Sequence, residues 1–176
     1  MARRLLRRFG RDRRGATAIE FAFVAVPFLF MMFALIELGV LFMMDVTLES
    51  AVGQTGRLVR TGQAQAQSMD AEQFKQNVCS RMGVFEGPCG ERLLVDVRVL
   101  IGGFTGQTPP DPVNSDGELS ENGLAFAMGG PGDIILISAW YAHPIATPLI
   151  SQGTERVAGH RVLNATTAFR NEPFGS

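Results

Sequence analysis

Residues 21–44 read FAFVAVPFLFMMFALIELGVLFMM and carry one charge in 24 positions, at Glu37. As an α-helix this run would be about 36 Å long, which exceeds the roughly 30 Å of hydrocarbon in a bilayer. The run is apolar on every helical face, whereas the core helix of a small domain would keep a polar stripe. The stretch therefore predicts a helix that spans a membrane.

The charges on either side of this run are strongly asymmetric. Residues 1–14 hold seven arginines and one acid, Asp12, whereas the chain after Gly15 holds 9 basic and 16 acidic residues. Positive charge next to a spanning helix stays on the cytoplasmic side. The arginines therefore predict a cytoplasmic N-terminus and a translocated acidic remainder.

Two other interpretations of this N-terminal region are weaker. A secretory signal has a shorter apolar region of roughly 7–15 residues, so we expect the segment to remain as an anchor. The arginines could bind nucleic acid, but they lack interleaved aromatic residues and lie beside a spanning segment, so topology is their simpler role. No nucleic-acid partner is expected.

The helical pattern continues beyond the apolar run. Between Val46 and Val59, apolar residues recur at spacings of three and four, and Gly62 is a plausible C-cap. One helix from about Ala16 to Thr61 would be about 69 Å long, so its second half can pack against a domain. Pro27 should bend or locally open this helix, because it lacks an N–H.

The remaining residues predict a small α+β domain. Asp70 can cap a short helix that reaches Met82, while residues 63–67 look like a polar linker. Alternating or apolar runs predict strands at residues 94–99 and 134–141, the latter central, with a third strand within 161–169. We expect a small antiparallel sheet packed on the long helix.

Gly102–Asp133 is a long Gly- and Pro-rich excursion between the first two strands. Loops of this length within a small domain are usually functional or disordered.

The two cysteines, Cys79 and Cys89, are ten positions apart, at the end of a helix and in a Gly-Pro loop. In an oxidising compartment a disulfide is the favoured interpretation. A metal site needs more ligands than two cysteines, and the two histidines show no ligand spacing to them. No metal or cofactor is expected.

The common catalytic motifs do not occur in this sequence. There is no Walker A loop, no Rossmann glycine pattern after a strand, no His-Glu-x-x-His and no Gly-x-Ser-x-Gly. No nucleophile and base can be nominated, so the sequence does not predict an enzyme.

The junction at residues 13–21, RRGATAIEF, is a more specific indication of function than any of the motifs considered above. One interpretation is a helix start, with Thr17 as cap and Glu20 as its capping-box partner. However, a lone carboxylate at the membrane margin is costly and therefore a functional candidate. A cut after Gly15 would create an α-amine at Ala16, close enough for Glu20 to neutralise. The Gly-x4-Glu-Phe pattern, which ends at Phe21, resembles the prepilin-peptidase site of type IV pilins and pseudopilins.

Further motifs narrow the resemblance to the TadE-like family of the tight-adherence (Flp, type IVc) pilus system. They are Gly15–Pro27, Ala51–Arg57, Thr61-Gly62, Pro131-Gly132-Asp133 and the ending Phe169–Pro173. The similarity covers most of the chain and is weakest across residues 63–131. The short length favours TadE or TadF over the longer TadG.

This resemblance implies a minor pseudopilin needed for pilus assembly and adherence. Its implied partners are other pilins and pseudopilins, a prepilin peptidase, the inner-membrane assembly platform and the bilayer. The implied segments are a basic leader at 1–15, a transmembrane and extended helix at 16–62 and a periplasmic α+β domain at 63–176. The location is the bacterial inner membrane, with the extracellular pilus as a further destination. The alternative is an unprocessed, membrane-anchored extracytoplasmic sensor or binding domain.

Overall fold

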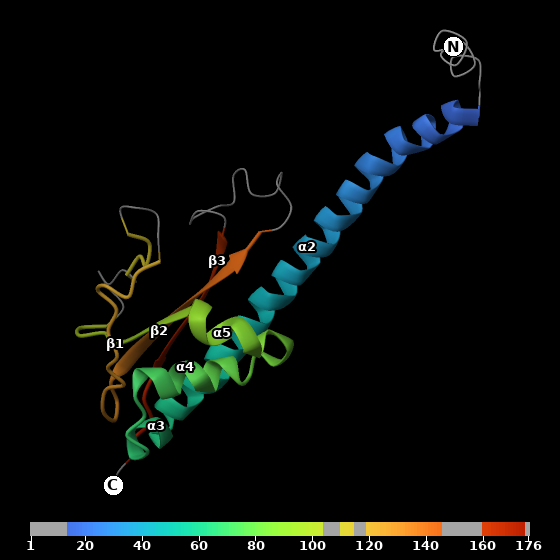
Figure 1. Ribbon diagram of the computed structural model, residues 1–176. Coiled ribbons are helices and arrows are strands. Elements are labelled where there is room, and N and C mark those ends of the chain that lie inside the picture. The colour runs from blue at the N-terminus through green and yellow to red at the C-terminus, as the bar shows by residue number, and fades with distance from the viewer. Residues whose placement is uncertain (1–13, 104–109, 115–118, 146–159, 175–176) are drawn as a thin grey trace. The chain divides into compact units, whose positions relative to one another are not determined.

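The computed structural model describes residues 14–103, 110–114, 119–145 and 160–174. Its elements are α2 (Arg14–Arg60), α3 (Gln63–Ala66), α4 (Ala71–Cys79), the 3-10 turn η1 (Gly83–Phe85), α5 (Glu86–Arg92), β1 (Leu93–Val99), β2 (Ile134–Pro144) and β3 (His160–Arg170) (Figure 1). The chain divides into two compact units, Met1–Gly39 and Val40–Ser176. A long apolar helix followed by a small sheet confirms the α+β class.

The described part of the first unit is the N-terminal portion of α2. Its large apolar side chains are exposed, including Phe21 at 74% and Phe23 at 78%. The helix continues through Pro27 without a break. It is long and apolar enough to cross a membrane. Since these side chains do not pack against other residues in the described part of the unit, the helix fits a single-pass membrane anchor.

The second unit contains one antiparallel sheet in the order β1-β2-β3. The register is fixed by three residues that lie side by side across the strands. Val97 of β1 lies opposite Ile137 of β2, and Ile137 lies opposite Thr167 of β3. The most apolar of the three strands is the central one, as its sequence predicted.

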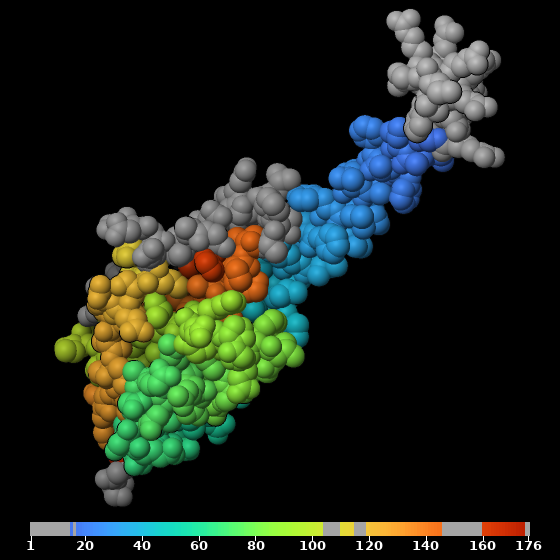
Figure 2. Space-filling model, viewed as in Figure 1, coloured from blue at the N-terminus to red at the C-terminus, as the bar shows by residue number. Residues whose placement is uncertain are grey.

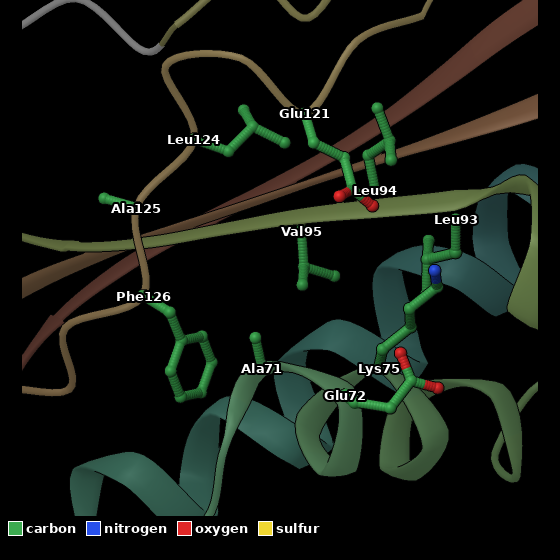
Figure 3. Close-up of a pocket in the computed structure, with 10 residues that line it drawn as sticks. All are labelled: Ala71, Glu72, Lys75, Leu93, Leu94, Val95, Glu121, Leu124, Ala125 and Phe126. Carbon is green, nitrogen blue, oxygen red and sulfur yellow. The ribbon is translucent and has the colours of Figure 1, made fainter.

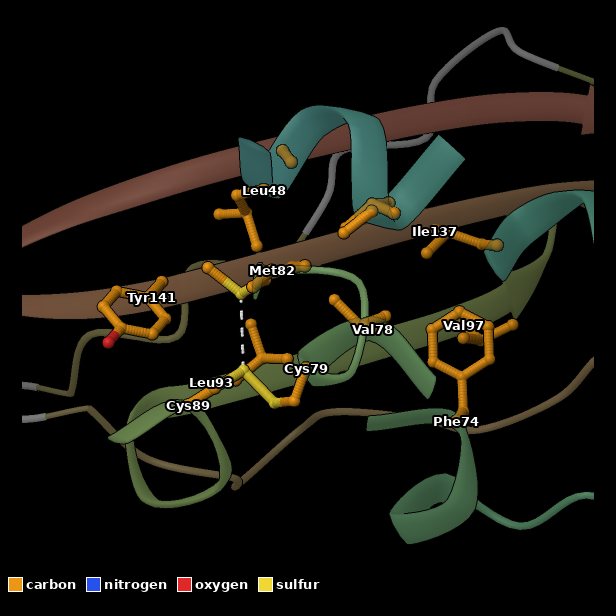
Figure 4. Close-up of a cluster of buried hydrophobic side chains, with 14 of the residues drawn as sticks. Leu48, Phe74, Val78, Cys79, Met82, Cys89, Leu93, Val97, Ile137 and Tyr141 are labelled. Carbon is orange, nitrogen blue, oxygen red and sulfur yellow. Dashed lines mark hydrogen bonds between the residues drawn. A yellow bond between two sulfur atoms is a disulfide. The ribbon is translucent and has the colours of Figure 1, made fainter. Parts of the chain in front are cut away.

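The core lies between one face of this sheet and the helices of the same unit (Figure 4). Leu48 of α2 and Phe74 of α4 are fully buried, as are Ile137 and Tyr141 of β2. At Gly56, α2 lies very close to the sheet. A Cβ added there would be only 3.2 Å from the Ile137 side chain. The C-terminal part of α2 is therefore a core element of this unit.

Asp70 caps α4 as predicted, with the reciprocal capping box to Gln73. This helix ends at Cys79, however, and Met82 lies in the turn that follows. The expected linker at 63–67 is instead the short helix α3, because its Gln-Ala repeat favours helix and Ala66 N–H donates to the Gly62 carbonyl at 3.0 Å.

The loop expected around Pro88 is mostly the helix α5. Pro88 is tolerated there because it occupies the first turn, where an N–H would have no partner within the helix. Figure 2 shows residues 70–92, in green, as one continuous surface. In the Gly102–Asp133 excursion, residues 104–109 and 115–118 lie outside the described part of the chain.

Candidate functional site

The predicted cleavage junction lies in the first turns of α2. The helix begins at Arg14, so Thr17 is not its N-cap and the capping-box interpretation of Glu20 is wrong. Glu20 and Phe21 are both exposed. The structure does not test the cleavage, which stays a prediction.

Gly15 has no structural explanation within the described part of this chain. A Cβ added there would meet no atom within 4 Å, and Gly15 is not among the glycines with positive φ. A helical glycine costs roughly 0.5–1 kcal/mol relative to alanine. A requirement from outside the chain, such as a protease that needs a small residue, would account for it.

Glu37 lies farther along the same helix, about 25 Å from Glu20 at 1.5 Å per residue. It is half-buried, whereas Glu20 is exposed. The two carboxylates therefore do not share one site. Pro27 lies between them, inside the helix.

At the other end of α2, the C-terminal residues 170–174 close the helix terminus; we call them the C-terminal clasp. Glu172 N–H donates to the Arg60 carbonyl at 2.9 Å, and Arg60 Nη2 lies 2.9 Å from Glu172 Oε1. The Phe174 ring covers Gly62, where an added Cβ would clash with the ring. Gly62 has φ 78°, so the predicted C-terminal stop at this glycine is confirmed.

Asn171 joins the clasp to the turn that precedes β2. Its Nδ2 donates to the carbonyls of Met128 and Gly130, both at 3.0 Å, and its backbone N–H donates to Asp133 O at 2.8 Å. Gly132 N–H in turn donates to the Asn171 carbonyl at 3.2 Å. The Pro-Gly-Asp turn and the Arg-Asn-Glu-Pro ending therefore form one structural unit, which the sequence alone did not reveal.

Cys79 and Cys89 form the predicted disulfide, with a Cα–Cα distance of 5.5 Å. Both are buried, and the Cys89 and Met82 sulfur atoms are 3.4 Å apart (Figure 4). The bond joins the end of α4 to α5. It holds two short helices that would be marginal on their own.

An ion pair between the buried Asp96 and the partly exposed Arg98 on β1 was missed by the sequence interpretation. The alternation at residues 94–99 would put Asp96 on the polar face of the strand, yet its side chain is fully buried. Its carboxylate accepts from Nε and Nη2 of Arg98 and from Ala125 N–H at 2.7 Å. The hydrogen bond to Asp96 raises the pKa of Arg98 above its ordinary value. The signal was present, since residues two apart on a strand share a face.

Among the described residues, no group of three or more His, Cys, Asp or Glu side chains could hold a metal ion. Neither a curated protein nor a solved structure matches the chain. Residues 15–57 match the family described as TadE-like protein.

Over this segment the chain is TadE-like. The match begins at Gly15 and includes the apolar run and the part of α2 that packs in the core of the second unit. It relates the chain to a structural, non-enzymatic kind of protein associated with the tight-adherence pilus. The TadE-like resemblance expected from the sequence is therefore confirmed.

Proposed function

We propose that the chain is a minor pseudopilin needed to assemble a tight-adherence pilus, and that a prepilin peptidase cuts it between Gly15 and Ala16. The observation that carries this proposal is the TadE-like match that begins at Gly15, a glycine with no packing or backbone requirement of its own.

Removal of the leader would place a new α-amine at Ala16, four residues before Glu20. Residues four apart lie on the same helix face, so the Glu20 carboxylate can pair with this amine or with that of a neighbouring subunit. Such pairing lowers the cost of leaving a carboxylate at the membrane margin. The amine and Glu20 would then set the position of one pilin helix against another.

The exposed apolar side chains of α2 would contact lipid before assembly and other pilin helices afterwards. The α+β domain would lie in the periplasm, with the N-terminus in the cytoplasm because the arginines favour that side. The partners in this proposal are other pilins and pseudopilins, the prepilin peptidase and the inner-membrane assembly platform.

The test is the intact mass of the protein from cells with and without the prepilin peptidase. Active peptidase should lower the mass by about 1.9 kDa, the size of the 15-residue leader. Gly15→Val should block the cut. Gly39→Val is the matched control, since Gly39 is another α2 glycine with open space around it, and this variant should be cut normally.

Full-length protein as the sole species in the presence of active peptidase would contradict the proposal. That result would favour an anchored domain that is never processed.

A further inference from the structure

The outer edge of β1 is paired at Val97 but not at Val95. Val97 N–H donates to Ala125 O at 2.8 Å, and Ala127 N–H donates to Val97 O at 2.7 Å, on the side away from β2. Backbone groups of alternate residues point to the same side of a strand, so the N–H and C=O of Val95 face this outer edge as well. The described residues offer them no backbone partner.

The pairing stops because two side chains take the groups that would continue it. A further parallel bridge at Val95 would use the N–H of Ala125 and the carbonyl of Gly123. Ala125 N–H instead donates to Asp96 Oδ1 at 2.7 Å, and Gly123 O accepts from Arg98 Nη2 at 3.2 Å. The Asp96–Arg98 pair thus holds the neighbouring segment away from β1 and leaves this part of the edge open.

A groove of about 300 Å³ lies at the open edge (Figure 3). On one side of β1 the figure shows Glu121 and Leu124, and on the other Lys75 and Phe126. Phe126 is held in place by an edge-to-face contact with Phe74, with ring centroids 5.8 Å apart. The groove therefore has two different walls. The wall at Phe126 is apolar and fixed in position, and the wall at Glu121 carries a carboxylate.

The charges of the groove favour a basic occupant. Glu121 is exposed, and among the described residues no cation forms an ion pair with it. Glu72 and Lys75 stand on α4, so the lining carries two carboxylates and one ammonium. Side chains of an extended segment alternate between two faces, which would direct apolar groups to Phe126 and a basic group to Glu121.

We propose that this groove binds an extended segment of another polypeptide, with an apolar-basic-apolar sequence, as an added strand on β1. Val95 N–H and C=O, together with the carbonyl of Leu93, would supply the backbone hydrogen bonds; Leu93 N–H is already used by Cys89 O. Strand addition of this kind takes affinity from the main chain and specificity from alternate side chains. The inference rests on the proposed function in one respect, namely that the polypeptide is a neighbouring pilin subunit.

The test uses the full chain in lipid nanodiscs and the capped pentapeptide Thr-Val-Arg-Val-Thr. Amide chemical shifts should move saturably at Val95 and Leu124. A peptide with backbone N-methyl groups on both valines loses its donors and should bind about ten-fold more weakly. Glu121→Gln should weaken binding of the arginine peptide by about two- to five-fold, but not that of a matched peptide with glutamine at the centre.

Absence of saturable binding, or equal binding of the N-methylated peptide, would overturn the proposal. Self-association of the chain that Glu121→Gln abolishes would also overturn it, because the occupant would then be a second copy. Peptide binding requires neither cleavage nor a pilus. A negative result here therefore leaves the Gly15 test of the proposed function unaffected, and failure of that test leaves this one intact.

Discussion

Replacing Asn171 by alanine should destabilise the second unit by removing a side chain that joins the C-terminal clasp to the turn at residues 128–130. Asn171 is 2% exposed, and its Nδ2 makes two hydrogen bonds, to the carbonyls of Met128 and Gly130. Both carbonyls keep another donor after the change. The Met128 carbonyl still accepts from Gln65 Nε2 at 3.1 Å, and the Gly130 carbonyl still accepts from Asp133 N–H at 3.3 Å. The cost is therefore that of two hydrogen bonds rather than of two unpaired buried acceptors.

At about 1 kcal/mol for each bond, the free energy of unfolding should fall by about 2 kcal/mol. For a unit of this size, that corresponds to a decrease in Tm of roughly 8 °C. Asn171→Asp should cost more, because a carboxylate oxygen would replace the donor and face both carbonyls in a buried site.

The assay is thermal unfolding of the full chain in detergent, followed by the fluorescence of Trp140. This is the only tryptophan of the chain, and it is 3% exposed in β2. Asn164→Ala is the matched control, because that amide is exposed and its two hydrogen bonds are long, one donated to Ala139 O at 3.4 Å and one accepted from Thr166 Oγ1 at 3.2 Å. It should change the free energy of unfolding by less than about 0.5 kcal/mol.

If Asn171→Ala melts within a degree of the Asn164→Ala variant, the reasoning is wrong. The clasp would then contribute no measurable stability, and its hydrogen bonds would merely replace equivalent bonds to water.

Three further predictions concern other parts of the chain. Glu20→Ala should leave the protein inserted and cleaved but abolish its co-purification with other pilins, whereas Glu37→Gln should have a smaller effect; unchanged co-purification of the Glu20 variant would refute amine pairing. Reduction of the Cys79–Cys89 disulfide should lower the free energy of unfolding by about 2–3 kcal/mol, and equal denaturation midpoints with and without reductant would argue against this. Gly62→Ala should cost about 2 kcal/mol or more, since it combines a left-handed backbone with a clash against a ring, and circular dichroism melting that matches the wild type would contradict it.

The features predicted correctly from the sequence have local signatures. The capping box places Asp70 and Gln73 three positions apart, and the strands follow from runs of alternating or continuously apolar residues. The long apolar helix follows from length and composition alone. The disulfide was favoured by the expected compartment and by the absence of other cysteines.

Some of the missed features depend on contacts between residues that are distant in sequence. In the others, tertiary packing overrides a local sequence preference. Arg60 and Glu172 are 112 positions apart, and no local pattern relates them. The helix α5 contains two glycines and a proline, which indicate a loop unless the neighbouring core and disulfide hold it. Asp96 obeys strand alternation, yet the segment at 123–125 covers it, and that coverage is a tertiary fact.

The C-terminal clasp has a consequence for the order in which this protein can mature. Because Glu172 closes the end of a helix that finishes at Arg60, the second unit cannot complete its fold until the chain has been synthesised as far as Glu172. The apolar part of α2 has no such dependence and can form its helix while translation continues. Formation of the apolar helix therefore precedes completion of the second unit, and a stop codon in place of Asn171 would yield a protein whose second unit stays open to proteases.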